Sequence, residues 1–163
     1  MQILPVVRII AMVCAGLYAG ILLGDRLGAS YARARIDASA FVQFQQVQHV
    51  HFVRFMPALT IASILAAVIW AFLVRAQWRM PDFWMIVASA LVFVACAVLT
   101  RMVSVPLNNL MMTWNAASPP ANLHELWAPW ERVHTIRALL SFAGFVLQAI
   151  AVSCAIWRGR PVP

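Results

Sequence analysis

Long uninterrupted apolar stretches dominate the sequence, and short polar segments separate them. A helix that crosses the hydrocarbon core of a bilayer needs about 20 predominantly apolar residues. If arginines at the ends of the stretches reach back to the headgroups, the spans fall at residues 3–24, 52–75, 83–103 and 134–157. The pattern therefore predicts an all-α integral membrane protein, a multi-pass four-helix bundle forming a single domain over residues 1–163.

The polar segments between these spans differ in length. The segment RAQWRMPD links the second and third spans tightly, whereas the segments after the first and third spans are much longer. Both long segments follow an odd-numbered span, so they must lie on the same side of the membrane. We therefore expect two helical hairpins with their long polar connections on one side. Asp37 is placed to cap a helix that begins well before the second span.

Composition agrees with a membrane location and excludes one alternative. Hydrophobic residues make up 64% of the chain and the net charge is +7. That charge comes from arginines scattered singly near the span ends, without any lysine, which is typical of cations at the headgroup level. We therefore predict a lipid bilayer as the partner and no nucleic acid.

Glycines recur at spacing four in the first span, at Gly16, Gly20 and Gly24. Such spacing leaves a smooth helix face that a second backbone can approach closely. One hypothesis is therefore a non-catalytic membrane subunit, or an oligomer, that packs through this face. The glycine face also argues against a cleaved signal peptide, which needs no packing surface.

Ionisable residues with regular spacing stand at the start of the last span. Glu131, His134 and Arg137 are three positions apart, so on a helix they form one slowly drifting stripe. Charged groups at the edge of the hydrocarbon are expensive, and they face one another or a cavity rather than lipid. The stripe therefore predicts a polar site inside the bundle.

The same spacing occurs at the start of the second span, in Gln48, His51 and Arg54. The second and fourth spans enter the membrane from the same side. We therefore expect the two stripes to face each other across a shared pocket for a hydrophobic small molecule, with His51 and Arg54 as the wall opposite His134.

A metal-free site is the preferred interpretation. A neutral His134, oriented by Glu131, can take a proton from a weakly acidic carbon while Arg137 and Asn108 stabilise the oxyanion that forms. The substrate would be apolar and aromatic. Aromatic side chains placed to stack on it are Phe44, Trp114, Trp127 and Trp130.

A second hypothesis uses the two histidines as ligands. His51 facing His134 could hold a haem or a copper ion, and Arg54 with Arg137 could neutralise haem propionates. This would make the protein a membrane redox protein rather than one that works by metal-free deprotonation.

The stretches SVPLNNLMMTW and SPPANLHELWAPWERVHTIRALLSFAGF resemble the anthrone oxygenase-like integral membrane proteins. The resemblance implies a four-span fold and an oxygenase activity on an anthrone-like or quinol-like substrate, since fungal members oxidise anthrones to anthraquinones while most bacterial members form a domain of unknown function. We also expect a bacterial inner-membrane location. Ser104 departs from the pattern, because many relatives carry asparagine there. The matching positions are Pro106, Asn108, Trp130, His134 and Arg137.

Overall fold

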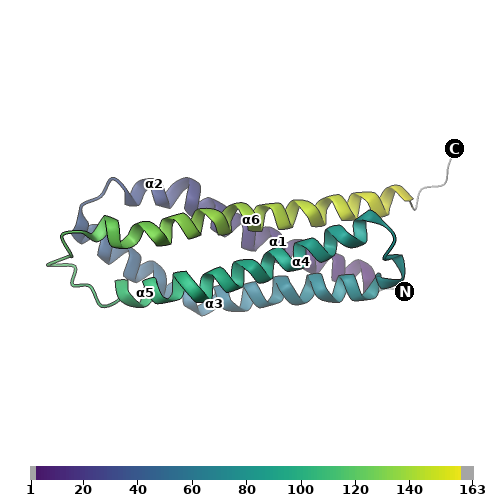
Figure 1. The fold of residues 1–163 in the computed structure, drawn as a ribbon, viewed down its shortest axis with the longest axis horizontal. Helices are drawn as coiled ribbons and strands as arrows, with labels where there is room; N and C mark the ends of the chain where they lie inside the picture. Colours follow the sequence, from purple (N-terminus) through teal and green to yellow (C-terminus); the bar gives the residue numbers. More distant parts are fainter. Residues whose placement is uncertain (1–2, 159–163) are drawn as a thin grey trace.

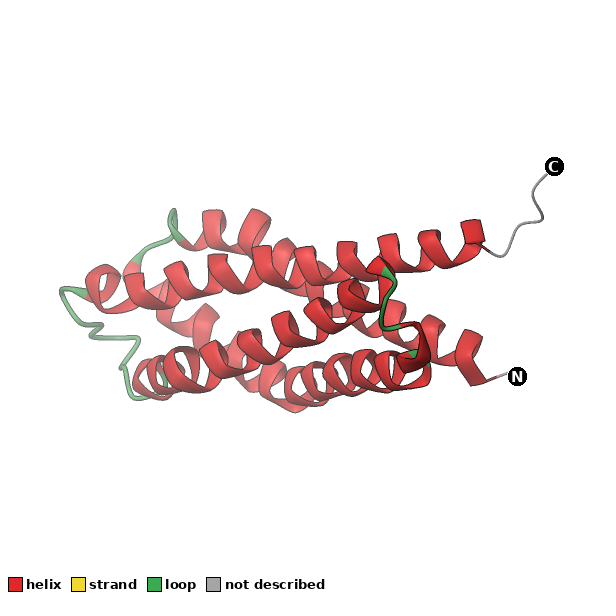
Figure 2. Cartoon of the chain, turned by 45° about the vertical axis from the view of Figure 1, so that its right-hand side comes forward, coloured by secondary structure: helices red, strands yellow, loops and turns green. Residues whose placement is uncertain are grey.

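The computed structural model describes residues 3–158, and this part of the chain consists of helices joined by short connections (Figure 1, Figure 2). Several helices continue into one another and form long rods. The elements in chain order are α1 (Ile3–Gly24), the π-helical turn η1 (Asp25–Ala29), α2 (Ser30–Arg33), α3 (Ala38–Leu73), the short 3-10 helix η2 (Arg75–Gln77), α4 (Pro81–Leu99), the π-helical turn η3 (Thr100–Ser104), α5 (Val105–Met111) and α6 (Leu123–Arg158).

Four rods form a bundle in which each is antiparallel to its neighbours. The first rod is α1 with η1 and α2, and the third is α4 with η3 and α5. Helix α3 packs against α1 and α4, and α6 packs against the same two helices. Consequently α3 and α6 lie diagonally opposite each other (Figure 1). This arrangement confirms the predicted all-α four-helix bundle.

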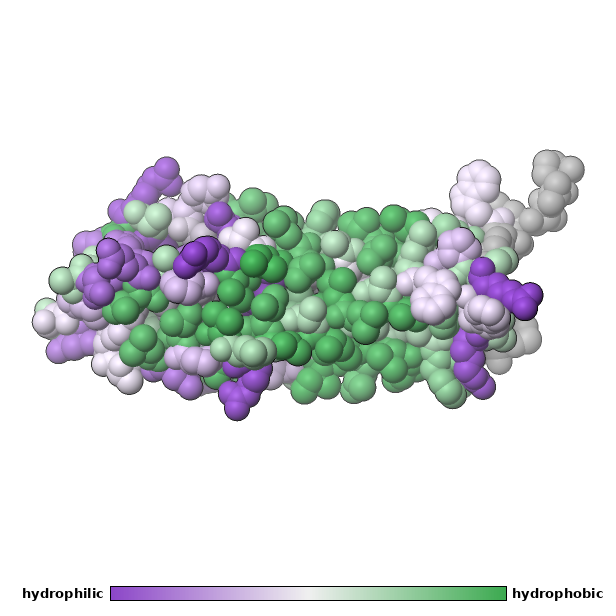
Figure 3. All heavy atoms as spheres, in the orientation of Figure 1, coloured by the Kyte–Doolittle hydropathy of each residue, from purple (hydrophilic) through white to green (hydrophobic). Residues whose placement is uncertain are grey.

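An apolar belt covers the middle of the bundle on the face that Figure 3 shows. Each of the four rods contains a stretch long and apolar enough to cross a membrane. Large hydrophobic side chains stay exposed on the belt, for example Leu17, Leu91 and Leu139. In water such a surface would cause aggregation, whereas contact with lipid chains carries no free-energy cost for apolar side chains. The chain is therefore a multi-pass membrane protein.

The helices extend beyond the predicted spans at the end that carries the polar segments. Helix α3 begins at Ala38 and α6 begins at Leu123, more than ten residues before the spans predicted for them. Asp37 caps α3 as predicted, because its Oδ1 accepts a hydrogen bond of 2.9 Å from the amide of Ala40. The long polar segments are thus mostly helix, and they carry the bundle past the apolar belt.

Within residues 3–158, three buried hydrophobic clusters follow one another along the bundle. The end cluster lies nearest the short α3–α4 link, the middle cluster fills the centre, and the capping cluster closes the extended end. The buried members of the end cluster are Ala11, Ala66, Trp70, Val74, Ile86 and Ala151. Those of the middle cluster are Ala15, Tyr18, Leu22, Phe93, Cys96 and Ala138. Those of the capping cluster are Phe41, Val42, Met111, Leu123, Trp127 and Trp130.

Glycines allow close helix approach at two positions inside the bundle. A Cβ at Gly144 would lie 3.1 Å from the ring of Phe93 on α4, and one at Gly16 would lie 3.3 Å from the ring of Phe145 on α6. At Gly20 and Gly24 a Cβ would meet no described atom within 4 Å. The glycine face predicted for α1 is therefore divided between the bundle interior and its open surface.

This division makes Gly144→Leu destabilising and Gly20→Leu tolerated. Leucine at position 144 must displace Phe93, and overpacking of this kind typically lowers the free energy of unfolding by ~1–3 kcal/mol. Leucine at position 20 meets open space, so we expect a change within about 0.5 kcal/mol. Thermal unfolding of the two variants in the same detergent measures the difference. An equal decrease in unfolding temperature in the two variants would contradict this packing.

Candidate functional site

A buried ion pair lies where α1 passes into α2. The guanidinium of Arg33 makes two parallel contacts with the carboxylate of Asp25, Nη1 to Oδ1 at 3.0 Å and Nη2 to Oδ2 at 2.9 Å. The side chain of Arg33 is 1% exposed and that of Asp25 is 8% exposed. Gln48 of α3 donates from Nε2 to Oδ1 of Asp25 at 2.7 Å. A bidentate pair with a further donor fixes the carboxylate in position.

His134 of α6 lies directly beside this carboxylate. Its Nε2 is 3.0 Å from Oδ2 of Asp25, and its Nδ1 is 3.3 Å from Nη2 of Arg137. A guanidinium can only donate hydrogen bonds, so the Nδ1 of a neutral imidazole must present its lone pair to Arg137. The ring proton therefore belongs on Nε2, which lies at ion-pair distance from Asp25 although the two atoms do not meet hydrogen-bond geometry. The imidazole is held between one carboxylate and one guanidinium.

Arg137 is tied to the third rod through the π-helical turn η3. Its Nη1 donates to Oγ1 of Thr100 at 2.8 Å, and that hydroxyl donates to the carbonyl of Cys96 at 2.7 Å. The side chain is buried, and its Nε has no hydrogen-bond partner within residues 3–158. Arg137 thus keeps donor capacity for a further acceptor.

An aromatic stack supports the imidazole. Trp127 and Trp130 stack with ring centroids 4.8 Å apart, and Trp130 stacks on His134 at 4.7 Å. The three rings lie on one face of α6, because residues three or four positions apart are neighbours on a helix. The guanidinium carbons of Arg33 and Arg137 lie 5.5 and 5.9 Å from the Trp130 ring. These contacts leave His134 little freedom to change its orientation.

Glu131 occupies a different place from the one predicted for it. Its carboxylate accepts from Ser30 Oγ at 3.0 Å and from Arg33 Nη2 at 3.3 Å. The carboxylate in contact with His134 is Asp25 instead. Glu131 therefore anchors Arg33, and the two acidic and two arginine side chains of the cluster balance in charge. Paired charges of this kind are the state in which ionised groups persist inside a membrane protein.

A pocket of about 380 Å³ opens onto this cluster. Its volume is within the ~300–1,000 Å³ usual for small-molecule sites. Apolar side chains of α3 and the third rod form most of its wall, including Phe52, Met56 and Val105. The polar residues of the wall come from all four rods and are Tyr18, Asp25, Gln45, Gln48, His49, Thr60, Thr100, Arg101, Asn108, His134 and Arg137.

The structure brings together some of the predicted site residues. His134, Arg137, Trp130 and Asn108 all line the pocket. Two predicted residues lie elsewhere inside the protein: Trp127 is buried in the capping cluster, and Trp114 packs edge-on against it at 6.2 Å.

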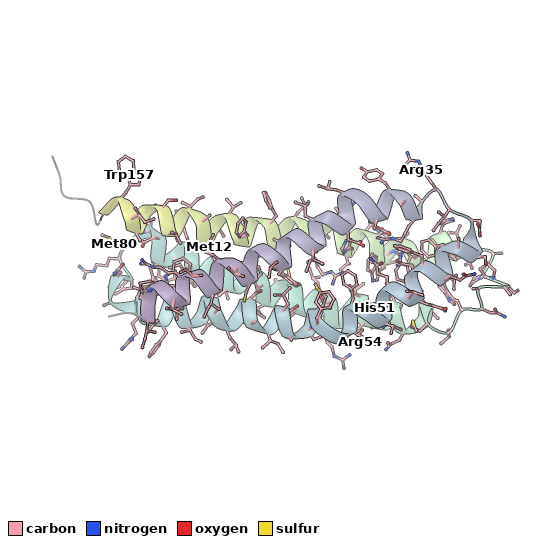
Figure 4. All side chains as sticks on the ribbon, turned by 180° about the vertical axis from the view of Figure 1, so that it is seen from behind. Met12, Arg35, His51, Arg54, Met80 and Trp157 are labelled. Atoms are coloured by element: carbon pink, nitrogen blue, oxygen red, sulfur yellow. The ribbon has the colours of Figure 1, made fainter. Side chains whose placement is uncertain are left out.

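The predicted opposing wall does not face the pocket. His51 and Arg54 are exposed, and Figure 4 shows Arg54 pointing away from the bundle. Phe44 is exposed as well, at 41%. Residues at spacing three drift by about 60° per step around a helix, so a stripe that begins inside at Gln48 leaves the interior by Arg54. Gln48 and His49 take the inward position instead.

The two-histidine metal hypothesis loses its geometry for the same reason. His51 lies on an outer surface with Gln46, Val47 and Met112, whereas His134 is buried beside Asp25. No group of three or more His, Cys, Asp or Glu side chains is placed to hold a metal ion in the described part of the chain. The structure therefore does not bring His51 and His134 together around a haem or copper.

Two π-helical turns carry parts of the site, η1 with Asp25 and η3 with Thr100. A π turn inserts one residue into a helix and re-aims the side chains around it, and such turns are frequent at functional sites. Both lie at the level where the pocket meets the ionic cluster. Asp25 and Arg33, eight residues apart, consequently fall on one inward face.

Fold and site together define the class: a four-span helical membrane protein in which a buried ionic cluster borders a largely apolar pocket. The anthrone oxygenase family model matches residues 44–147, which is more than half of the chain. The chain belongs to the anthrone oxygenase family, as the sequence resemblance indicated. No curated protein and no solved structure matches it. The matched region contains His134 and Arg137, while Asp25 and Arg33 precede it.

Proposed function

We propose that the protein is an oxygenase that deprotonates an apolar aromatic substrate of the anthrone or quinol type at His134. One observation supports this most strongly. The imidazole of His134 is held between the carboxylate of Asp25 and the guanidinium of Arg137, and all three side chains line an apolar pocket. A base, a group that stabilises its charged form, and a cation for the developing anion are thus adjacent.

His134 receives the proton at Nδ1 in this proposal. The contact between Nδ1 and Arg137 is long at 3.3 Å, so a substrate oxygen competes readily for the guanidinium. Arg137 then binds that oxygen and frees the Nδ1 lone pair for the acidic C–H of the substrate. Asp25, 3.0 Å from Nε2, stabilises the imidazolium that forms. Asn108 supplies a second donor for the oxyanion.

The carbanion reacts with dioxygen, which is the co-substrate. Transfer of electrons from the carbanion to O₂ forms a C–O bond and gives a peroxide anion, which takes the proton back from His134. Loss of water from the hydroperoxide leaves a new carbonyl. One CH₂ group and one O₂ thus become one C=O group and one H₂O, without net proton uptake. The apolar wall protects the carbanion from water until dioxygen arrives.

Isotope labelling of the product tests this function. Full-length protein in lipid nanodiscs is supplied with anthrone under ¹⁸O₂, and the quinone is analysed by mass spectrometry. We expect one labelled oxygen per quinone and one O₂ consumed per turnover, at a rate well above that of nanodiscs without protein. Product formation no faster than in empty nanodiscs, or unlabelled quinone, would overturn the proposed function.

A further inference from the structure

Buried side chains border both ends of the pocket along the bundle axis. Met111 and Trp130 border the pocket at the extended end, where they belong to the tightly buried capping cluster. Towards the other end Tyr18 and Leu22 border it, and both belong to the middle cluster. Among the described residues, therefore, neither polar end of the bundle offers a way in.

The side of the pocket is open. Val53 and Ile61 line it and yet are 50% and 57% exposed, and Pro57 between them is exposed as well. Ala97, Arg101 and Val105 line it from the third rod, and Arg101 is exposed. Spacing four places each set on one helix face. We call the opening between these two stripes the lateral mouth.

Irregularities in both helices account for the lateral mouth. Helix α3 packs against α4 and, further along, against α5, whereas the intervening turn η3 packs on α6. The π turn interrupts the regular α-helix of the third rod, and Pro57 lacks the N–H that would bond the carbonyl of Val53 in α3. Both irregularities lie beside the same opening, because Pro57 and Arg101 line the pocket.

The lateral mouth lies at the edge of the apolar belt. Val53, Pro57 and Ile61 are apolar, while Arg101 in the lining and Arg54 next to Val53 have exposed side chains, and Arg54 points away from the bundle (Figure 4). Exposed arginines beside apolar residues are typical of the boundary between lipid chains and headgroups. A molecule at this depth has polar groups at the headgroup level and apolar groups in the hydrocarbon.

We propose that the pocket takes its substrate sideways from the bilayer through the lateral mouth, and that this substrate is an aromatic ring system bearing an apolar chain. The ring reaches Asp25, His134 and Arg137, and the chain lies in the mouth and continues into lipid. The assignment of the ring as the reacting group rests on the proposed function. The apolar chain of the substrate defines its class. It is an amphipathic molecule that resides in the membrane rather than a compact, soluble aromatic molecule.

Binding of an oxidised probe tests this without turnover. Full-length protein in nanodiscs is titrated with tritium-labelled decyl-naphthoquinone and with chain-free naphthoquinone, compared at equal mole fraction in the membrane. We expect the wild type to bind the two probes with affinities within about threefold of each other. The decyl chain has apolar surroundings both in lipid and in the mouth, so moving it between them changes the free energy little. An enclosed pocket would instead exclude the decyl chain, and loss of decyl-probe binding of about tenfold or more would overturn the proposal.

Ile61→Trp fills the mouth and is the critical variant. We expect the variant to bind decyl-naphthoquinone about tenfold or more weakly than the wild type, because the decyl chain and the indole compete for one space. Its affinity for the chain-free naphthoquinone should stay within about threefold of the wild type. Leu65→Trp, one turn further along α3 at an exposed position outside the pocket, is the matched control and should bind both probes normally. Val53→Trp repeats the test at the same mouth should Ile61→Trp lose its helical circular dichroism. Unchanged decyl binding, or equal loss of both probes in a folded mouth variant, would overturn the proposal.

The outcomes separate this proposal from the proposed function. If anthrone is not oxidised but the mouth variants discriminate between the probes, the pocket binds a chain-bearing aromatic without oxygenating it. If anthrone is oxidised and the mouth variants do not discriminate, the oxygenase proposal stands and the chain-bearing substrate does not.

Discussion

Replacing His134 with alanine should reduce the rate of anthrone oxidation by roughly 10²–10⁴-fold, the usual contribution of a positioned general base. The variant loses the only imidazole in the described structure that contacts both Asp25 and Arg137. The substrate must then lose its proton to bulk base, which the apolar pocket excludes. Oxygen uptake and quinone formation measure the rate.

Folding must be controlled in the same experiment. Alanine at position 134 removes the ring that stacks on Trp130, so binding of decyl-naphthoquinone should be retained to show that the pocket persists. His51→Ala is the matched control, because His51 is exposed on the outer side of α3, and it should keep full activity. A His134→Ala protein that oxidises anthrone normally, or a His51→Ala protein that does not, would show that the base has been assigned to the wrong residue.

The second large effect is expected for Asp25→Asn. The amide keeps the shape of the side chain but removes the charge that stabilises the imidazolium, and loss of the carboxylate in histidine–carboxylate pairs lowers kcat by up to about 10⁴-fold. We expect kcat to fall by roughly 10²–10⁴-fold, with little change in KM and unchanged binding of the oxidised probe. Steady-state kinetics separates the two constants. Asp37→Asn, at an exposed helix cap where asparagine is equally suitable, is the control.

Stability and catalysis can be separated at this position. Asp25→Asn leaves the guanidinium of Arg33 buried without its bidentate partner, and breaking a buried pair from one side typically lowers stability by ~3–5 kcal/mol. The double variant Asp25→Asn/Arg33→Met removes both charges, so it should regain much of the stability without regaining turnover. Full recovery of turnover in the double variant would mean that Asp25 serves the fold alone.

The fold could be predicted from the sequence because membrane spans have a strong signal. A hydrocarbon core demands long apolar stretches, and four of them determined the bundle. The lengths of the helices were harder to predict from the sequence. Residues 38–51 and 123–133 are amphipathic or polar, and hydropathy alone assigns them to connections, although Asp37 signalled the start of α3.

The candidate site was predictable on α6 and not on its partners. His134 and Arg137 stand out because charge at the start of a span is costly, and the structure places both in the buried cluster. The repeat in α3 suggested His51, while the structure places His49 inward. His49 and His51 are two positions apart and therefore point to opposite sides of the helix. Spacing alone cannot tell which of the two sides faces the bundle interior.

Asp25 and Arg33 could have been recognised by one signal. They are opposite charges eight residues apart at the end of a span, about 2.2 turns of a regular helix, so their side chains lie within about 80° of each other around the axis. The π turn η1 and the partner Glu131, ninety-eight positions along the chain from Arg33, are tertiary features that no local pattern contains. This is why the contact of Asp25 with His134 emerges only from the packed bundle.

Hydrogen exchange in the absence of dioxygen tests the central claim most directly. Wild-type protein in nanodiscs is incubated anaerobically with anthrone in D₂O, and deuterium at the acidic carbon is followed by mass spectrometry against empty nanodiscs. If His134 removes that proton, the wild type should accelerate exchange well above the spontaneous rate and His134→Ala should not. Oxidation of anthrone in air by a protein that does not accelerate this exchange, or equal acceleration by His134→Ala, would contradict the account.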